Sequence, residues 1–134
     1  MHTYFSHDSK MSPKSLVSRC IEVGLDCIAV TDHNTIDGAL EVRDLAPFMV
    51  IVGEEVKSSG GEITGLFLRE TVPRDLSPVE TVKCIKEQGG LVSIPHPFDR
   101  FRTSVISQLA LEEVLPYVDV VEVYSCVIVA LATR

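Results

Sequence analysis

The sequence contains no tryptophan, and only 6% of its 134 residues are aromatic. It also lacks any apolar stretch that approaches the roughly 20 residues of a membrane-spanning helix, because the apolar run over residues 127–132 is far shorter. No apolar segment follows Met1, which argues against a secretory signal peptide. We therefore expect a cytoplasmic protein with no membrane segment.

Positive charge is also scarce. The chain carries 12 Lys and Arg against 19 Asp and Glu, which gives a net charge of −7. This balance argues against a general nucleic-acid-coating protein, whose binding surface should be basic. A nucleotide or a nucleic-acid end stays open as a substrate, because bound divalent cations would reverse the local charge of an acidic site.

Cys-x-x-Cys spacing is absent among the four cysteines. Cys20, Cys27 and Cys84 lie among apolar residues of predicted helices or strands. This pattern is typical of small buried hydrophobic side chains in a reducing compartment.

What the chain does have is enough apolar residues, 46%, to build one packed domain or part of one. Strand-like and helix-like segments alternate, which predicts an α/β fold with a largely parallel sheet. The Gly60–Gly61 turn predicts one antiparallel hairpin. Strands are expected at 26–31, 48–52, 63–68, 91–94 and 118–124.

Two Ser-Pro pairs predict helix starts, at Ser12 and at Ser77. The first helix should end at Gly24 and the second at Gly89–Gly90. Glu80 is expected one residue early for a capping box. A further helix should begin after Asn34 or Thr35 and run to about residue 46, and another should cover roughly 105–117.

The candidate functional residues are histidines and carboxylates at strand ends and in loops. The carboxyl ends of parallel strands meet at one edge of a sheet, so these side chains are expected to converge. Imidazole and carboxylate ligands together favour Zn, Mn or Fe. The residues concerned are His2, His7, Asp8, Asp32, His33, Glu54, Glu55 and His96.

Each of these residues taken singly has a simpler interpretation. His33 can help to cap the following helix, and His96 can be an exposed ring in a Pro-His-Pro turn. Glu54 and Glu55 can form a solvated turn, and because side chains alternate along a strand only one of them can face a site. We assign that place to Glu55, since Gly53 permits close approach of the backbone.

The order of these motifs resembles the polymerase and histidinol phosphatase (PHP) domain family over essentially the whole chain. The matching stretches are residues 2–9 (HTYFSHDS), 31–34 (TDHN), 53–55 (GEE), 95–98 (PHPF) and 122–124 (EVY). The resemblance implies a distorted (β/α)7 barrel and a metal-dependent phosphoesterase that holds up to three divalent cations.

The resemblance also implies roles for individual residues. The implied metal ligands are His2, Asp8, His33, Glu55 and His96, with Glu55 bridging two cations. The candidate catalytic residues are Asp32, which precedes His33 and would orient it, and His7, which by its position alone and not through the resemblance is a candidate donor to the leaving oxygen. Apart from the resemblance, Arg100 and Arg102 follow His96 and could hold the substrate phosphate, or could lie with Asp99 in a solvated loop.

The chain also departs from the family pattern. The first histidine of the His-x-His pair and a late Asp-x-His are absent, and Ser125 stands where many relatives have Asn. Residues 127–131 read as the opening of another element. We therefore expect a partial barrel over residues 1–134 that lacks its first strand and its last βα units. Such a chain exposes sheet edges, so we expect self-association or marginal stability.

Three functions follow as hypotheses. The first is hydrolysis of phosphate monoesters, or of nucleotide or nucleic-acid ends, by metal-activated water. The second is a truncated, non-catalytic PHP domain with a structural or interaction role. The third, a metal-dependent amidohydrolase or deacetylase, fits the 31–34 and 95–98 motifs less well.

Overall fold

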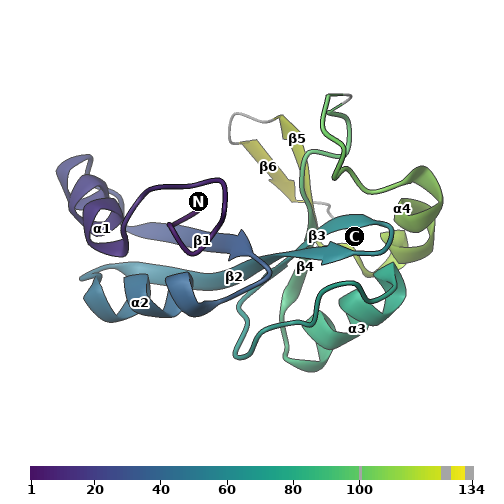
Figure 1. Cartoon of the computed structure of the whole chain (residues 1–134), viewed down its shortest axis with the longest axis horizontal. Helices are drawn as coiled ribbons and strands as arrows, with labels where there is room; N and C mark the ends of the chain where they lie inside the picture. The colour runs from purple at the N-terminus through teal and green to yellow at the C-terminus, as the bar shows by residue number, and fades with distance from the viewer. Residues whose placement is uncertain (100, 125–127, 132–134) are drawn as a thin grey trace.

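The structure is a computed structural model, which describes residues 1–99, 101–124 and 128–131. Six strands form one curled sheet in chain order (Figure 1). The strands are β1 (Cys27–His33), β2 (Met49–Ser58), β3 (Gly61–Leu66), β4 (Leu91–Ile94), β5 (Val120–Tyr124) and β6 (Ile128–Leu131). The helices are α1 (Pro13–Glu22), α2 (Asp37–Leu45), α3 (Pro78–Glu87) and α4 (Gln108–Val114), followed by a 3-10 turn, Leu115–Tyr117.

The predicted α/β class is confirmed, but the sheet is more mixed than the sequence suggested. β1 is parallel to β2, and β4 is parallel to β5. β3 is antiparallel to both of its neighbours, and β6 is antiparallel to β5. The short Gly60–Gly61 turn reverses the chain into β3, which forms the predicted hairpin with β2 and a second antiparallel pairing with β4. No helix in the described ranges is both long and apolar enough to cross a membrane.

Local capping explains where α1 and α3 begin. The Ser12 side chain accepts a hydrogen bond from the Ser15 N–H, and Ser77 does the same for Glu80. The Glu80 carboxylate in turn accepts a hydrogen bond from the Ser77 N–H at 3.0 Å. Because Pro78 is the first helical residue, Glu80 is the third, so the capping box that the sequence analysis rejected is present.

The start of α2 differs from the prediction. Neither Asn34 nor Thr35 is its N-cap, since Ile36 occupies that position without a side-chain bond. Asn34 instead adopts a left-handed conformation, with φ of 56°, and its Oδ1 accepts a hydrogen bond from the Lys57 N–H at 2.8 Å. The turn after β1 is thereby attached to β2, which fixes the end of both strands.

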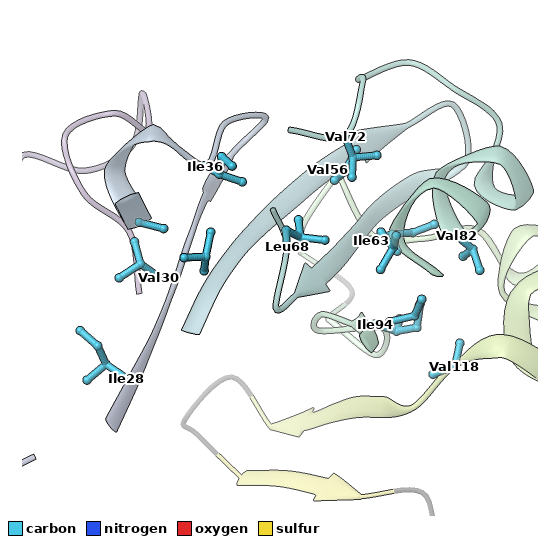
Figure 2. Packing of buried hydrophobic residues seen from close by; sticks show 14 of the residues in the cluster. Ile28, Val30, Ile36, Val56, Ile63, Leu68, Val72, Val82, Ile94 and Val118 are labelled. Carbon is cyan, nitrogen blue, oxygen red and sulfur yellow. The ribbon is translucent and has the colours of Figure 1, made fainter. Parts of the chain in front are cut away.

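The core lies between the sheet and the helices that cover one of its faces. α2 packs against β1 and β2, and α3 packs against β3 and β4. Figure 2 shows buried side chains of this core, among them Val30 of β1, Ile63 of β3 and Ile94 of β4. Cys20 is buried as predicted, but Cys27 is exposed because it begins β1 at the margin of the sheet. Cys126 lies outside the described residues.

The N-terminal residues run beside β1. The Met1 amino group donates to the Ala29 carbonyl at 3.0 Å, and the Met1 carbonyl accepts from the Thr31 N–H at 2.8 Å. These two bonds have the pattern of a parallel pairing. The loop that follows is drawn beside β1 near the end that meets the turn into α2 (Figure 1). Residue His2 is thereby brought to the edge of the sheet where His33 ends β1.

Candidate metal centre

Strand register decides which of the sequence-predicted residues can meet. His33 of β1 lies opposite Glu55 of β2, and Asp32 lies opposite Glu54. Since side chains alternate between the faces of a sheet, His33 and Glu55 share one face while Asp32 and Glu54 share the other. Asp32 and Glu54 point toward the helices and are fully buried. The face away from the helices therefore carries the cluster.

Glu55 lies at the centre of that cluster. Its Oε2 is 3.3 Å from Nε2 of His2, and its Oε1 is 3.2 Å from Nε2 of His96. The three residues come from the N-terminal loop, from β2 and from the turn after β4. His96 thus contacts a carboxylate that is 41 residues away in the sequence.

His33 joins the N-terminal loop to the same cluster. Its Nε2 is 3.1 Å from Oδ2 of Asp8. Its ring stacks on that of His2, with centroids 4.8 Å apart and planes 6° from parallel. The His7 ring lies 5.2 Å from the His33 ring in a tilted arrangement, and the His7 side chain is exposed. All three histidines of this half of the chain therefore lie together.

Glu62 also belongs to the cluster, although the sequence analysis did not select it. Its Oε1 is 3.6 Å from Nδ1 of His33, and its Oε2 is 3.3 Å from Nε2 of His96. The available signal was the hairpin at Gly60–Gly61. Its register pairs Glu55 with Thr64, so strand alternation puts Glu62 on the same face.

Burial and the neighbouring side chains shift the pKa of several groups in the cluster. The hydrogen bond that the His2 ring donates to Glu55 raises the pKa of His2. Burial works in the opposite direction on Glu55, but the imidazoles of His2 and His33 hold the pKa of Glu55 well below its ordinary value. Burial and the neighbouring Glu55 carboxylate raise the pKa of Glu62. At Asp8, burial is outweighed by His33 and His2, so the pKa of Asp8 is lowered.

The donor set fits divalent cations. Donor atoms of His2, Asp8 and His33 all lie within 4.8 Å of one another, and so do those of His33, Glu55 and Glu62. Nitrogen and carboxylate oxygen donors in this mixture suit Zn, Mn or Fe. Glu62 Oε2 and His96 Nδ1 are buried and make no hydrogen bond. Buried polar atoms without partners are rare in native proteins, and Glu62 Oε2 lies within the cluster, where a bound cation would supply its missing partner.

Asp32 supports the N-terminal loop and does not enter the cluster. Its Oδ1 accepts from the Thr3 N–H at 2.5 Å and from the Ser6 hydroxyl at 3.0 Å, and its Oδ2 accepts from the Thr3 hydroxyl at 2.6 Å. The same Ser6 oxygen accepts from the His33 N–H at 2.8 Å. Asp32 therefore positions the segment between His2 and Asp8, rather than orienting the His33 ring directly as the sequence analysis suggested.

The backbone at His96 is held in an uncommon conformation. Its φ is 33°, and prolines precede and follow it. The Glu122 carboxylate of β5 accepts a hydrogen bond from the His96 N–H at 2.8 Å. Positive φ at a non-glycine residue costs about 1 to 3 kcal/mol and persists where surrounding contacts enforce it. Glu122 and the two prolines thus fix the ring that reaches Glu55 and Glu62.

The two predicted phosphate-binding arginines have different outcomes. Arg100 lies outside the described residues. Arg102 is about half exposed, and its Nε is 3.2 Å from Oδ2 of Asp99. In the described part of the chain its guanidinium thus pairs with a neighbouring acid of its own loop.

The buried Glu54 carboxyl should make stability depend on pH. Burial raises its pKa from 4.5 to about 7, against a hydrogen bond from the Val72 N–H. Because the folded state binds this proton more tightly, the stabilisation is complete below about pH 4.5 and is lost as the pH rises through about 7. Between pH 5 and 8 the metal-free protein should lose about 2 to 3 kcal/mol more than Glu54→Gln. Urea unfolding at several pH values measures this difference, and parallel profiles would contradict it.

Comparison with known proteins agrees with the geometry. The model of the PHP domain family matches residues 1–124. An uncharacterized protein of Methanocaldococcus jannaschii is 44% identical over 94 residues, which are 68% of this chain and 55% of that protein. A second uncharacterized protein of the same organism is 37% identical over 119 residues, 86% of this chain and 46% of that protein. The chain thus spans about half the length of the curated relatives it matches.

Two solved structures share the fold. One is a two-domain protein of Bacteroides vulgatus that contains a predicted PHP-like metal-dependent phosphoesterase. Its TM-score is 0.74 at 21% identity, and the match covers 92% of this chain and 42% of that protein. The other, from Bifidobacterium adolescentis, is also assigned by prediction to the metal-dependent phosphoesterases. Its TM-score is 0.69 at 15% identity, over 92% of this chain and 75% of its own. The predicted fold, a curled α/β sheet of the PHP type, is confirmed.

Proposed function

Because the chain belongs to the PHP domain family, we propose that it is a divalent-metal-dependent phosphoesterase. The observation that carries this proposal is the convergence of His2, His33 and His96 on one central carboxylate cluster. Separate segments supply these rings, and the donor spacing suits cations. Two adjacent cations suit phosphoryl transfer, because together they can stabilise the attacking and the leaving oxygen of a reacting phosphate.

The proposed division of labour follows the contacts. His2, Asp8, His33, Glu55 and His96 would hold the cations. Bound cations would supply an activated water and neutralise the charge that develops on the phosphate oxygens. The exposed His7, beside His33 at the outer margin of the cluster, is the candidate donor of a proton to the leaving oxygen.

Two neighbouring features bear on the rest of the substrate. A pocket of about 340 Å³ is formed by the β2–β3 turn and by residues 103–107, and Lys57 lines it. Lys57 lies opposite Glu62 in the strand register, so its side chain leaves the sheet on the same face as the cluster. Its ammonium group could therefore bind the phosphate of a substrate. The side chains of Phe98 and Phe101, shortly after His96, are highly exposed and could stack on a nucleobase. Both small hydroxylated phosphate esters and nucleotides therefore belong in the substrate panel.

Activity should depend on the cations. We expect the chelator-treated protein to release no phosphate from a panel of monoesters, and addition of Mn²⁺ or Zn²⁺ to restore turnover above the metal-only background. Phosphate release is the measurement, with sugar phosphates, nucleoside monophosphates and a 5′-phosphorylated oligonucleotide as substrates. If no compound turns over although elemental analysis finds bound metal, the phosphoesterase proposal fails and the non-catalytic alternative stands.

A further inference from the structure

The cluster contains one more carboxylate than the family resemblance assigns, and that residue is Glu62. It follows the β2–β3 hairpin and faces the cluster from β3. Only 7% of Glu62 is exposed, and its Oε2 has no hydrogen-bond partner although it lies 3.3 Å from Nε2 of His96. A charged side chain this deeply buried needs a compensating charge.

The surrounding donors lie close enough to Glu62 to share a cation with it. Nε2 of His96 is 3.2 Å from Oε1 of Glu55 and 3.3 Å from Oε2 of Glu62, and Oε1 of Glu62 is 3.6 Å from Nδ1 of His33. Ligand atoms about 2.0 to 2.2 Å from one tetrahedral cation lie about 3.3 to 3.6 Å apart. The two separations that involve Glu62 lie within that range, and the Glu55–His96 separation is just below it.

Charge leads to the same assignment. Glu55 and Glu62 approach each other closely at a site where both are more than nine-tenths buried. Two carboxylates sharing a buried site repel each other unless a proton or a cation lies between them. Imidazole rings on both sides complete a set of neutral and anionic donors with no cationic side chain among them.

We propose that Glu62 is a metal ligand, and that it completes a cation position with Glu55 and His33, whose donor atoms lie within 4.8 Å of one another and of a Glu62 oxygen. The proposal rests on the metal dependence of the proposed function. It also separates two positions around His33, whose Nδ1 faces Glu62 and whose Nε2 faces Asp8. A neutral imidazole offers one lone pair, so a cation on the Glu62 side leaves the other nitrogen protonated, to donate to Asp8.

Metal binding by Glu62→Gln tests this assignment. We expect the variant, freed of metal by a chelator, to bind Mn²⁺ at least about tenfold more weakly at one position, because even residues that only support a ligand change affinity by about 10- to 100-fold. Isothermal titration calorimetry and elemental analysis measure this loss. The matched control is Glu113→Gln, which removes an exposed carboxylate from α4. Unchanged Mn²⁺ stoichiometry and affinity in Glu62→Gln would overturn the proposal.

Thermal unfolding separates a ligand from a merely structural residue. Without metal, Glu62→Gln should be at least as stable as the parent protein, because a carboxylate beside Glu55 has been neutralised. With Mn²⁺, the parent should gain more in midpoint temperature than the variant does. A variant that is destabilised without metal and gains as much as the parent from Mn²⁺ would make Glu62 structural. Parent protein that binds Mn²⁺ through Glu62 but hydrolyses no ester would refute only the proposed function.

Discussion

Replacing Glu55 with glutamine is expected to reduce phosphoesterase turnover by more than about 100-fold. Glu55 contacts His2 through one oxygen and His96 through the other, so it links the N-terminal loop to the turn after β4. The amide in Glu55→Gln keeps the shape but removes the charge and one of the two anionic donors. Changes at residues that merely support a ligand already cost about 10- to 100-fold, so loss of the central ligand should cost more.

Phosphate release with saturating Mn²⁺ and elemental analysis of the same sample together test Glu55→Gln. The control is Glu70→Gln, which neutralises an exposed carboxylate in the loop after β3 and should leave turnover unchanged. Circular dichroism should show that both variants are folded, because Glu55 lies on the face away from the apolar core. A folded Glu55→Gln protein with near-normal turnover would show that phosphate release occurs elsewhere on the molecule.

Strand register explains why much of the site could be predicted from sequence. His33 and Glu55 each follow an apolar run, and β1 pairs in parallel with β2 so that the two residues are directly opposite. A parallel pair of strands with side chains of period two can be inferred from such runs. The choice of Glu55 over Glu54 used that same alternation, and the structure places Glu54 among the core residues.

Antiparallel pairing explains what was missed. Glu62 is near the start of a strand, where a search for residues after strand ends does not look. It enters the cluster because the hairpin returns the chain beside β2 with a register that only the turn fixes. A carboxylate on the second residue of a hairpin strand reads in sequence as an exposed turn residue.

The burial of individual polar side chains could not be predicted from the sequence either. Asp32 and His33 are adjacent in sequence and both polar, so composition cannot tell the buried one from the partly exposed one. Nor could the pattern show that Thr3 and Ser6 would fold back onto β1 and bring three donors to one carboxylate. Such a contact depends on the path of the loop between residues 1 and 9, which carries little periodicity.

The hydrogen bonds of Asp32 make it possible to distinguish a catalytic role of this residue from a structural one. If Asp32 acted only in the chemical step, its replacement would lower turnover and leave the metal-free protein as stable as before. If Asp32 holds the loop, as its hydrogen bonds with Thr3 and Ser6 indicate, its replacement must destabilise the protein even when no metal is bound. The same loop presents His2 and Asp8, so weaker metal binding should follow from the loss of order.

For Asp32→Asn we therefore expect the metal-free protein to lose about 2 to 4 kcal/mol in free energy of unfolding. Hydrogen bonds to a charged group contribute about 1.5 to 3 kcal/mol each, and the asparagine amide would face a donor where the carboxylate accepted a bond. Urea unfolding of the chelator-treated protein measures the loss, and calorimetry should show weaker Mn²⁺ binding although Asp32 contacts no donor of the cluster. Asp44→Asn, an exposed acid on α2, is the matched control. Normal stability with reduced turnover would return Asp32 to the catalytic role that the sequence first suggested.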